Sequence, residues 1–136
     1  MFTYNINLIP ACPVVSIRIK DEFRHFQLPP VSMLIDTGAD YSCIPASSLQ
    51  HIPGVFYEGC TIEDYGGIRR RGKLVHFNDT SIEFLDPNFN IILSRYYGDL
   101  SMLILESEDG GLLGRDILNK HICELNGPNL QFKFQV

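Results

Sequence analysis

The stretch MLIDTGADYSCIP, residues 33–45, passes from apolar chain into a short polar turn and then back into apolar chain. The apolar part begins at Val31, and a run of this kind predicts a short buried strand over residues 31–35. Asp36 follows directly at the end of that strand. Because an ionised carboxylate is costly to bury without hydrogen-bond partners, neighbouring groups must supply them. The Thr37 hydroxyl and the Gly38 N–H are the nearest candidates.

Taken alone, Asp36-Thr37-Gly38 has two interpretations. An isolated tripeptide of this kind is more often a strand-end turn, in which the aspartate hydrogen-bonds its own backbone. The alternative is a carboxylate held at the end of a strand for chemistry. The residues farther along the chain distinguish the two.

Length and composition limit the functions that this aspartate can serve. The chain has 136 residues, of which 45% are hydrophobic, and this fits one domain, residues 1–136, with a single core. The formal net charge of -5 argues against nucleic acid as the main partner, because phosphate binding relies on clustered Lys and Arg. The sequence shows no apolar window of roughly 18 residues and no signal-peptide pattern. We therefore expect a cytoplasmic protein with neither nucleic-acid nor membrane partners.

The cysteines and histidines give no pattern of a metal site. No CxxC pair occurs, and no histidine stands at zinc-ligand spacing from the cysteines, which are Cys12, Cys43, Cys60 and Cys123. We expect these thiols to pack as small apolar groups. The sequence implies no metal and no organic cofactor.

Strand patterns dominate the chain. Residues 13–20 (PVVSIRIK) alternate apolar and polar side chains, which is typical of a half-buried strand. Residues 59–65 and 68–77 predict a long hairpin that bends at Gly66-Gly67, because adjacent glycines supply the positive φ angles of a tight turn. Further strands are expected at residues 41–44, 81–85, 90–94, 100–105, 121–125 and 130–135.

Helical signals are few. Pro45 and the serines after it predict one short helical turn. Residues 115–121 predict the main helix, with Asp116 in its first turn, where a carboxylate suits the helix dipole. The expected fold is therefore mostly β with one short C-terminal helix.

Three motifs in order resemble the retroviral-type aspartic proteases, the retropepsin-like family. They are LIDTGAD at residues 34–40, the Gly66-Gly67 hairpin, and LLGRD at residues 112–116 before the short helix. The resemblance spans residues 13–125 and suggests a cellular or bacterial member. It implies a closed, barrel-like acid-protease fold, with the active-site loop at 34–40, the flap tip at 64–68, and a supporting loop and helix start at 112–116.

The resemblance also implies a homodimer. An aspartic protease needs two carboxylates that share one proton about a water, because like charges so close cannot both ionise. This chain has one Asp-Thr-Gly motif, so the second aspartate must come from a second molecule in a closed twofold dimer. The implied function is an aspartic endopeptidase that hydrolyses peptide bonds. We expect residues 2–9 and 121–135 to join the dimer interface.

Roles follow for the residues of the active-site loop. The two Asp36 carboxylates would hold and activate the water, Thr37 would bond across to the other subunit, and Gly38 would hold the carboxylate through its N–H. Ala39 lacks the hydroxyl with which Ser or Thr stabilises an ionised aspartate, so we expect an activity optimum that is only mildly acidic. Asp40 either contacts the substrate backbone or forms a structural ion pair with Arg115.

The remaining assignments concern substrate binding and support. Tyr65, Gly66, Gly67 and Ile68 form either a lid that closes over the peptide or an ordinary surface hairpin. Residues 69–73 hold four of the eleven basic residues and are either a solvated face or the origin of a preference for acidic peptides. Gly114, Arg115 and Asp116 are expected to support the site, with Asp116 capping the helix.

Two other functions remain compatible with the sequence. One is a catalytically silent module with the protease fold that binds peptides or dimerises, since a fold does not guarantee an activity. The other is an unrelated small β domain in which DTGAD is only a turn.

Overall fold

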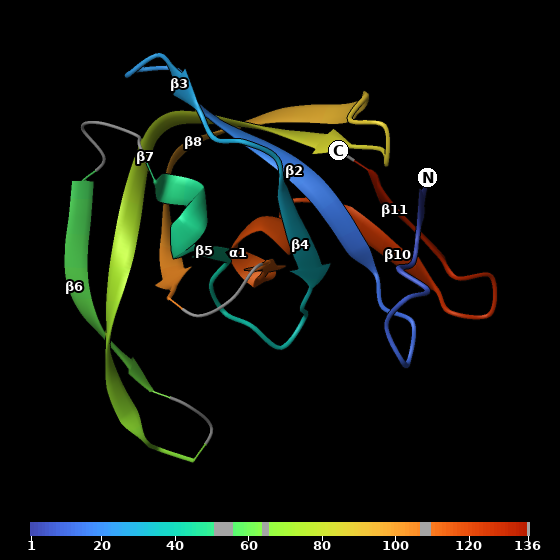
Figure 1. The fold of residues 1–136 in the computed structure, drawn as a ribbon, viewed down its shortest axis with the longest axis horizontal. Helices are drawn as coiled ribbons and strands as arrows, with labels where there is room; N and C mark the ends of the chain where they lie inside the picture. Colours follow the sequence, from blue (N-terminus) through green and yellow to red (C-terminus); the bar gives the residue numbers. More distant parts are fainter. Residues whose placement is uncertain (51–55, 64–65, 107–109, 136) are drawn as a thin grey trace.

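Figure 1 shows the computed structural model of the chain, which describes residues 1–50, 56–63, 66–106 and 110–135. Two sheets account for the strands of this described part. The larger contains β2 (Val14–Asp21), β3 (Phe26–Gln27), β4 (Val31–Ile35), β5 (Cys43–Pro45), β6 (Phe56–Glu63), β7 (Arg69–Leu85), β8 (Ile91–Leu105) and β9 (Gly111–Leu113). The smaller contains β1 (Phe2–Thr3), β10 (Ile122–Asn126) and β11 (Gln131–Gln135). A 3-10 turn, η1 (Ala46–Leu49), follows β5, and a short helix, α1 (Arg115–Leu118), follows β9.

The larger sheet closes into a barrel. Its strands pair in the order β2, β4, β9, β5, β8, β7, and β7 pairs back to β2 through Ile17↔Phe84 and Ile19↔Ile82. The alternation predicted for residues 13–20 is confirmed, because Val15, Ile17 and Ile19 are buried while the residues between them are half-buried. The mostly β, barrel-like fold that the sequence predicts is thus confirmed for the single chain.

Two long strands replace four predicted short ones. β7 covers the predicted strands 68–77 and 81–85, and β8 covers 90–94 and 100–105. The polar residues between the predicted strands do not end them. They form irregularities that face each other in the paired strands. The register of β7 against β8 shifts between Phe77 and Ser81, and Thr80 pairs with Gly98. The φ angle is 46° at Asp79 and 77° at Gly98.

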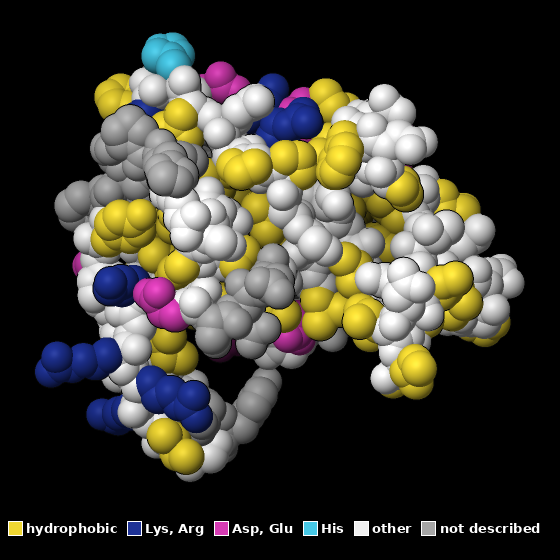
Figure 2. Space-filling model, viewed as in Figure 1, with side chains coloured by type: hydrophobic (Ala, Val, Ile, Leu, Met, Phe, Trp, Pro, Cys, Tyr) yellow, Lys and Arg dark blue, Asp and Glu magenta, His cyan; other side chains and the backbone are white. Residues whose placement is uncertain are grey.

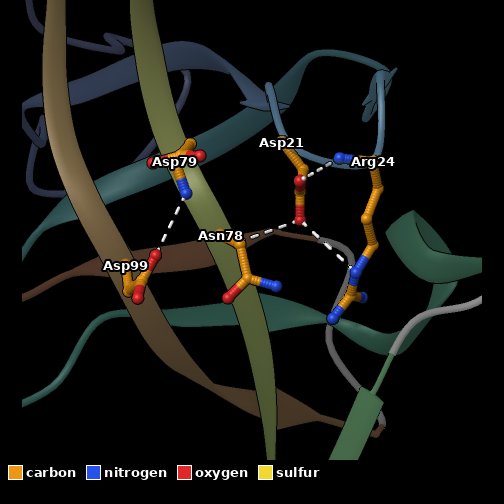
Figure 3. Close-up of polar contacts among 5 residues, drawn as sticks. All are labelled: Asp21, Arg24, Asn78, Asp79 and Asp99. Carbon is orange, nitrogen blue, oxygen red and sulfur yellow. Dashed lines mark hydrogen bonds and ion pairs between the residues drawn. The ribbon is translucent and has the colours of Figure 1, made fainter.

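Carboxylates hold the irregular part of β7 in place (Figure 3). Asp21 is buried, and its carboxylate accepts hydrogen bonds from the backbone N–H of Asn78 at 3.0 Å and of Arg24 at 2.8 Å. Asp99 accepts the backbone N–H of Asp79 at 3.1 Å. Because a bulged residue loses its place in the ladder, these carboxylates satisfy donors that would otherwise lack a partner.

The helix is shorter than predicted. α1 ends at Leu118, whereas the sequence predicted a helix to residue 121. The N–H groups of Lys120 and His121 bond to carbonyls three residues back, at Ile117 and Leu118, so the chain tightens and leaves the α-helix. None of the helices in the described part of the chain is long and apolar enough to cross a membrane.

The chain ends form the smaller sheet within one molecule. β1 pairs with β11 through Phe2↔Phe132, and these two rings stack with their centroids 5.1 Å apart. Phe132 is buried, and Phe134 contacts Phe84 of the barrel with ring centroids 5.2 Å apart. Phe132 and Phe134, which belong to the apolar face of residues 130–134, therefore pack within the same chain. The expected role of the chain ends in a dimer interface stays a prediction.

Candidate active site

Asp36 lies where β4 leaves the barrel. β4 runs parallel to β9, with Ile35 opposite Leu113, and the Asp36 N–H donates to the Leu113 carbonyl at 3.0 Å. The Gly38 N–H donates to Oδ1 of Asp36 at 3.0 Å, and the Ala39 N–H donates to the Asp36 carbonyl at 3.3 Å. The carboxylate is therefore held by the turn that follows it, while its side chain remains partly exposed.

The two segments that form the site cross directly behind this turn. The Arg115 N–H donates to the Ala39 carbonyl at 2.9 Å. A Cβ atom on Gly114 would lie 2.7 Å from the carbonyl carbon of Tyr41, 2.8 Å from its oxygen and 3.0 Å from the Ala39 oxygen. All three are backbone atoms that cannot rotate away, so residue 114 must be glycine for the segments to approach this closely.

Ser42 connects the crossing segments, although it is not among the site residues predicted from the sequence. Its side chain is fully buried, and its hydroxyl donates to Oδ1 of Asp116 at 2.7 Å. The Ser42 hydroxyl oxygen also accepts the Gly114 N–H at 3.0 Å, and the Ser42 N–H lies 3.0 Å from both Asp116 oxygens. We call Ser42, Gly114 and Asp116 the buried bracket. The sequence signal was a small polar residue, Ser42, just after DTGAD in otherwise apolar chain.

The prediction that Asp116 caps the helix is wrong. Gly114 occupies the N-cap position, and no side chain caps the helix there. Asp116 lies within the first turn, where its carboxylate accepts the Ile117 N–H at 2.9 Å and is otherwise directed to Ser42. Its supporting role is therefore to join two chain segments.

Asp40 and Arg115 form an ion pair at the edge of the site. Their side chains are 69% and 48% exposed, so solvent screens the pair and its contribution to stability is small, about 0 to 1 kcal/mol. This contact is the one that the structural interpretation of Asp40 expects. Because the carboxylate remains exposed, contact with a substrate backbone also stays a prediction.

Cys43 is buried at the start of β5, seven residues after Asp36. Burial raises the pKa of its thiol to about 11, with further contributions from the charges of Asp116 and Asp36. The reactive form of cysteine is the thiolate, which is scarce at neutral pH when the pKa is this high. The burial of Cys43 and the raised pKa of its thiol agree with the packing role that the sequence predicts.

The predicted hairpin is present and extends from the barrel on the lower side of Figure 1, as does the loop after β4. β6 and β7 pair from Phe56↔His76 to Glu63↔Arg69. Gly66, Gly67 and Ile68 are exposed at the tip, and φ of Gly67 is 78°. Tyr65 lies outside the described residues, and closure of this hairpin over a peptide stays a prediction.

The sequence was also compared with known proteins. Residues 10–126 match the family model described as retroviral aspartyl protease. The chain belongs to this family. The match includes the Asp-Thr-Gly loop, the hairpin and LLGRD, so the resemblance noted from the sequence is confirmed and an unrelated β domain is excluded. Membership of the family supports an aspartic-protease type of function. A comparison with curated proteins found no match.

Metal-binding side chains were sought in the described part of the chain. Among the described residues, no group of three or more His, Cys, Asp or Glu side chains is placed to hold a metal ion. The groups gathered around Asp36 in this part of the chain are backbone N–H donors and the buried bracket.

Proposed function

We propose that this protein is an aspartic endopeptidase that works as a twofold homodimer, with the Asp36 carboxylates of both chains holding the attacking water. The observation that carries this proposal is the position of Asp36 in a chain of the retroviral aspartyl protease family. It is held through Oδ1 by the Gly38 N–H at the open end of β4 and is partly exposed.

The need for a second chain follows from the other carboxylates of the site. Asp40 is paired with Arg115, and Asp116 is hydrogen bonded to Ser42. Both are therefore engaged in other contacts, and the sequence contains one Asp-Thr-Gly motif. Sharing a proton between two aspartates then requires Asp36 of a partner chain.

In the proposed reaction the two aspartates share one proton. The ionised carboxylate removes a proton from the water as its oxygen attacks the scissile carbonyl, and the protonated carboxyl hydrogen-bonds the carbonyl oxygen. When the tetrahedral intermediate collapses, the carboxyl that took the proton from the water gives it to the leaving nitrogen, and the C–N bond breaks. Thr37 is exposed beside Asp36, a position that suits the proposed bond across the dimer axis.

The test combines oligomeric state with cleavage. Sedimentation velocity should show a dimer, and cleavage of an unfolded protein substrate should be inhibited by statine compounds of the pepstatin type. Asp36→Asn should abolish cleavage while leaving the dimer intact, and Glu22→Gln, at an exposed position in the loop after β2, should leave both unchanged. Cleavage that persists in Asp36→Asn would refute the proposal.

The alternative is a silent module that binds peptides or dimerises without turnover. It predicts that wild type and Asp36→Asn bind a peptide equally well and that neither cleaves it. The cytoplasmic location expected from the sequence stays a prediction.

A further inference from the structure

A groove lies between the hairpin and the end of β8. Its volume is about 440 Å³, and three basic side chains from β7 line it, namely Arg70, Arg71 and Lys73. Ile62, Ile68 and Ile104 add apolar atoms to the wall, and Gly72 and Glu106 also line it. We call this the hairpin groove.

Among the described residues that line it, the hairpin groove carries an excess of positive charge. Glu106 is the one acidic side chain of this described lining. The other acids in the described part of the hairpin have partners, since Glu63 lies 3.9 Å from Arg69 and Glu58 lies 2.8 Å from His76. No carboxylate in the described part of the chain is within ion-pair distance of the three basic side chains of the groove. Figure 2 shows Lys and Arg gathered on the hairpin at the lower left, on a protein whose net charge is -5.

The topology relates the groove to Asp36. Ile104 pairs with Ile44 of β5, and the strand order β4, β9, β5, β8 places two strands between the one that ends at Asp36 and the one that carries Ile104. Three strand spacings amount to about 14 Å, which an extended peptide covers in about four residues. A peptide cleaved at Asp36 can therefore place a nearby side chain, but not the cleaved residue itself, in the groove.

We propose that the hairpin groove binds an Asp or Glu side chain of the substrate, about two to four residues from the cleaved bond. Guanidinium groups bind carboxylates with paired, charge-assisted hydrogen bonds, and the apolar wall can pack against the methylene groups of a glutamate. Gly72 helps to keep the groove open, because a Cβ atom there would lie 2.4 Å from Cδ1 of Ile62. In a twofold dimer the groove occurs twice, so the preference applies on both sides of the cleaved bond. This inference rests on the proposed endopeptidase function.

The test uses peptides that differ only by Glu or Gln at each position near the cleaved bond. The kcat/KM for Glu should exceed that for Gln by about tenfold, the range of one hydrogen bond to a charged group. The ratio should fall as NaCl is raised, because salt screens partly exposed charges. Equal rates for both peptides at every position would overturn the proposal.

Variants identify the side chains responsible. Arg70→Gln, Arg71→Gln and Lys73→Gln should each lower the Glu/Gln ratio, and the triple variant should bring it to about one. Arg69→Gln is the matched control, because Arg69 lies on the same strand, faces Glu63 and does not line the groove. A ratio that survives the triple variant, or that Arg69→Gln alone removes, would contradict the assignment.

A binding measurement separates this proposal from the proposed function. Fluorescence anisotropy of the same labelled peptides with the Asp36→Asn protein reports on the groove without any cleavage. If the wild type cleaves nothing, the endopeptidase proposal fails, and tighter binding of the Glu peptide still supports the groove. If the wild type cleaves but the Asp36→Asn protein binds both peptides equally, the groove proposal fails alone.

Discussion

The buried bracket gives the sharpest test of how the site is built, through Ser42→Ala. The Ser42 hydroxyl donates to the Asp116 carboxylate at 2.7 Å and accepts the Gly114 N–H at 3.0 Å. A hydrogen bond to a charged group contributes about 1.5 to 3 kcal/mol, and a buried donor left without an acceptor costs about 1 to 3 kcal/mol. The Ser42 N–H still reaches the carboxylate in the variant, so part of the first loss is recovered. We expect the free energy of unfolding to fall by about 3 kcal/mol, a large share of the roughly 5 to 15 kcal/mol typical of a domain.

Urea unfolding followed by circular dichroism measures this loss, with an unchanged m-value showing that the midpoint shift reports stability. The matched control is Ser48→Ala in η1, a buried serine whose side chain forms no hydrogen bond with other described residues. It should lose less than about 1 kcal/mol. A double-mutant cycle with Asp116→Asn should give a coupling energy above about 1 kcal/mol. The reasoning is refuted if Ser42→Ala costs no more than Ser48→Ala, or if the cycle shows no coupling.

Three further changes should have distinct effects. Thr80 is fully buried and its hydroxyl has no partner among the described residues, so Thr80→Val should raise the free energy of unfolding by about 1 kcal/mol in urea titrations; a loss of stability would show an unseen hydrogen bond. Burial, with the charge of Arg95, lowers the pKa of His121 in the folded chain. As the pH falls below about 6.5, the unfolded chain therefore takes up a proton on His121 before the folded chain does, and the free energy of unfolding decreases. Relative to wild type, His121→Phe should therefore flatten the fall in unfolding free energy between pH 7.5 and pH 5, and parallel profiles would contradict this. Ala39→Ser should add a hydroxyl donor near Asp36 and move the acidic limb of the pH–rate profile to lower pH, whereas an unmoved limb would mean that this hydroxyl does not reach the dyad.

Local sequence patterns were sufficient for much of the fold. The alternation of Val15, Ile17 and Ile19 predicted a barrel strand, and the buried strand before Asp36 was predicted with its correct bounds. Both predictions succeed because a strand that is buried on one or both faces has a recognisable pattern of apolar residues. The continuity of β7 and β8 was missed. A polar Asn78-Asp79 pair is typical of a turn, and the distant carboxylates of Asp21 and Asp99 hold the backbone N–H groups of this pair so that the strand continues.

In the candidate site, too, some features follow from the local sequence and others depend on distant residues. The positions of Asp36 and Gly38 follow from three consecutive residues, whereas the role of Ser42 depends on a partner 74 positions away. No local pattern specifies that pairing. The order of motifs along the chain did indicate that residues 34–40 and 112–116 belong to one site, but not which side chains connect them.

Through these connections the LLGRD residues help to set the position of Asp36, although they need not touch a substrate. The Leu113 carbonyl fixes the Asp36 N–H, Arg115 fixes Ala39, and Gly114 sets how closely the segments approach. Gly114→Ala would force backbone atoms of Tyr41 and Ala39 to move, and that movement would displace the turn whose N–H holds the carboxylate. In the proposed twofold dimer each such displacement would occur twice, on opposite sides of the proton that the two Asp36 carboxylates are proposed to share. Activity should therefore be more sensitive than stability to changes at this crossing, because proton sharing depends on the distance between two carboxylates while the core of each barrel does not.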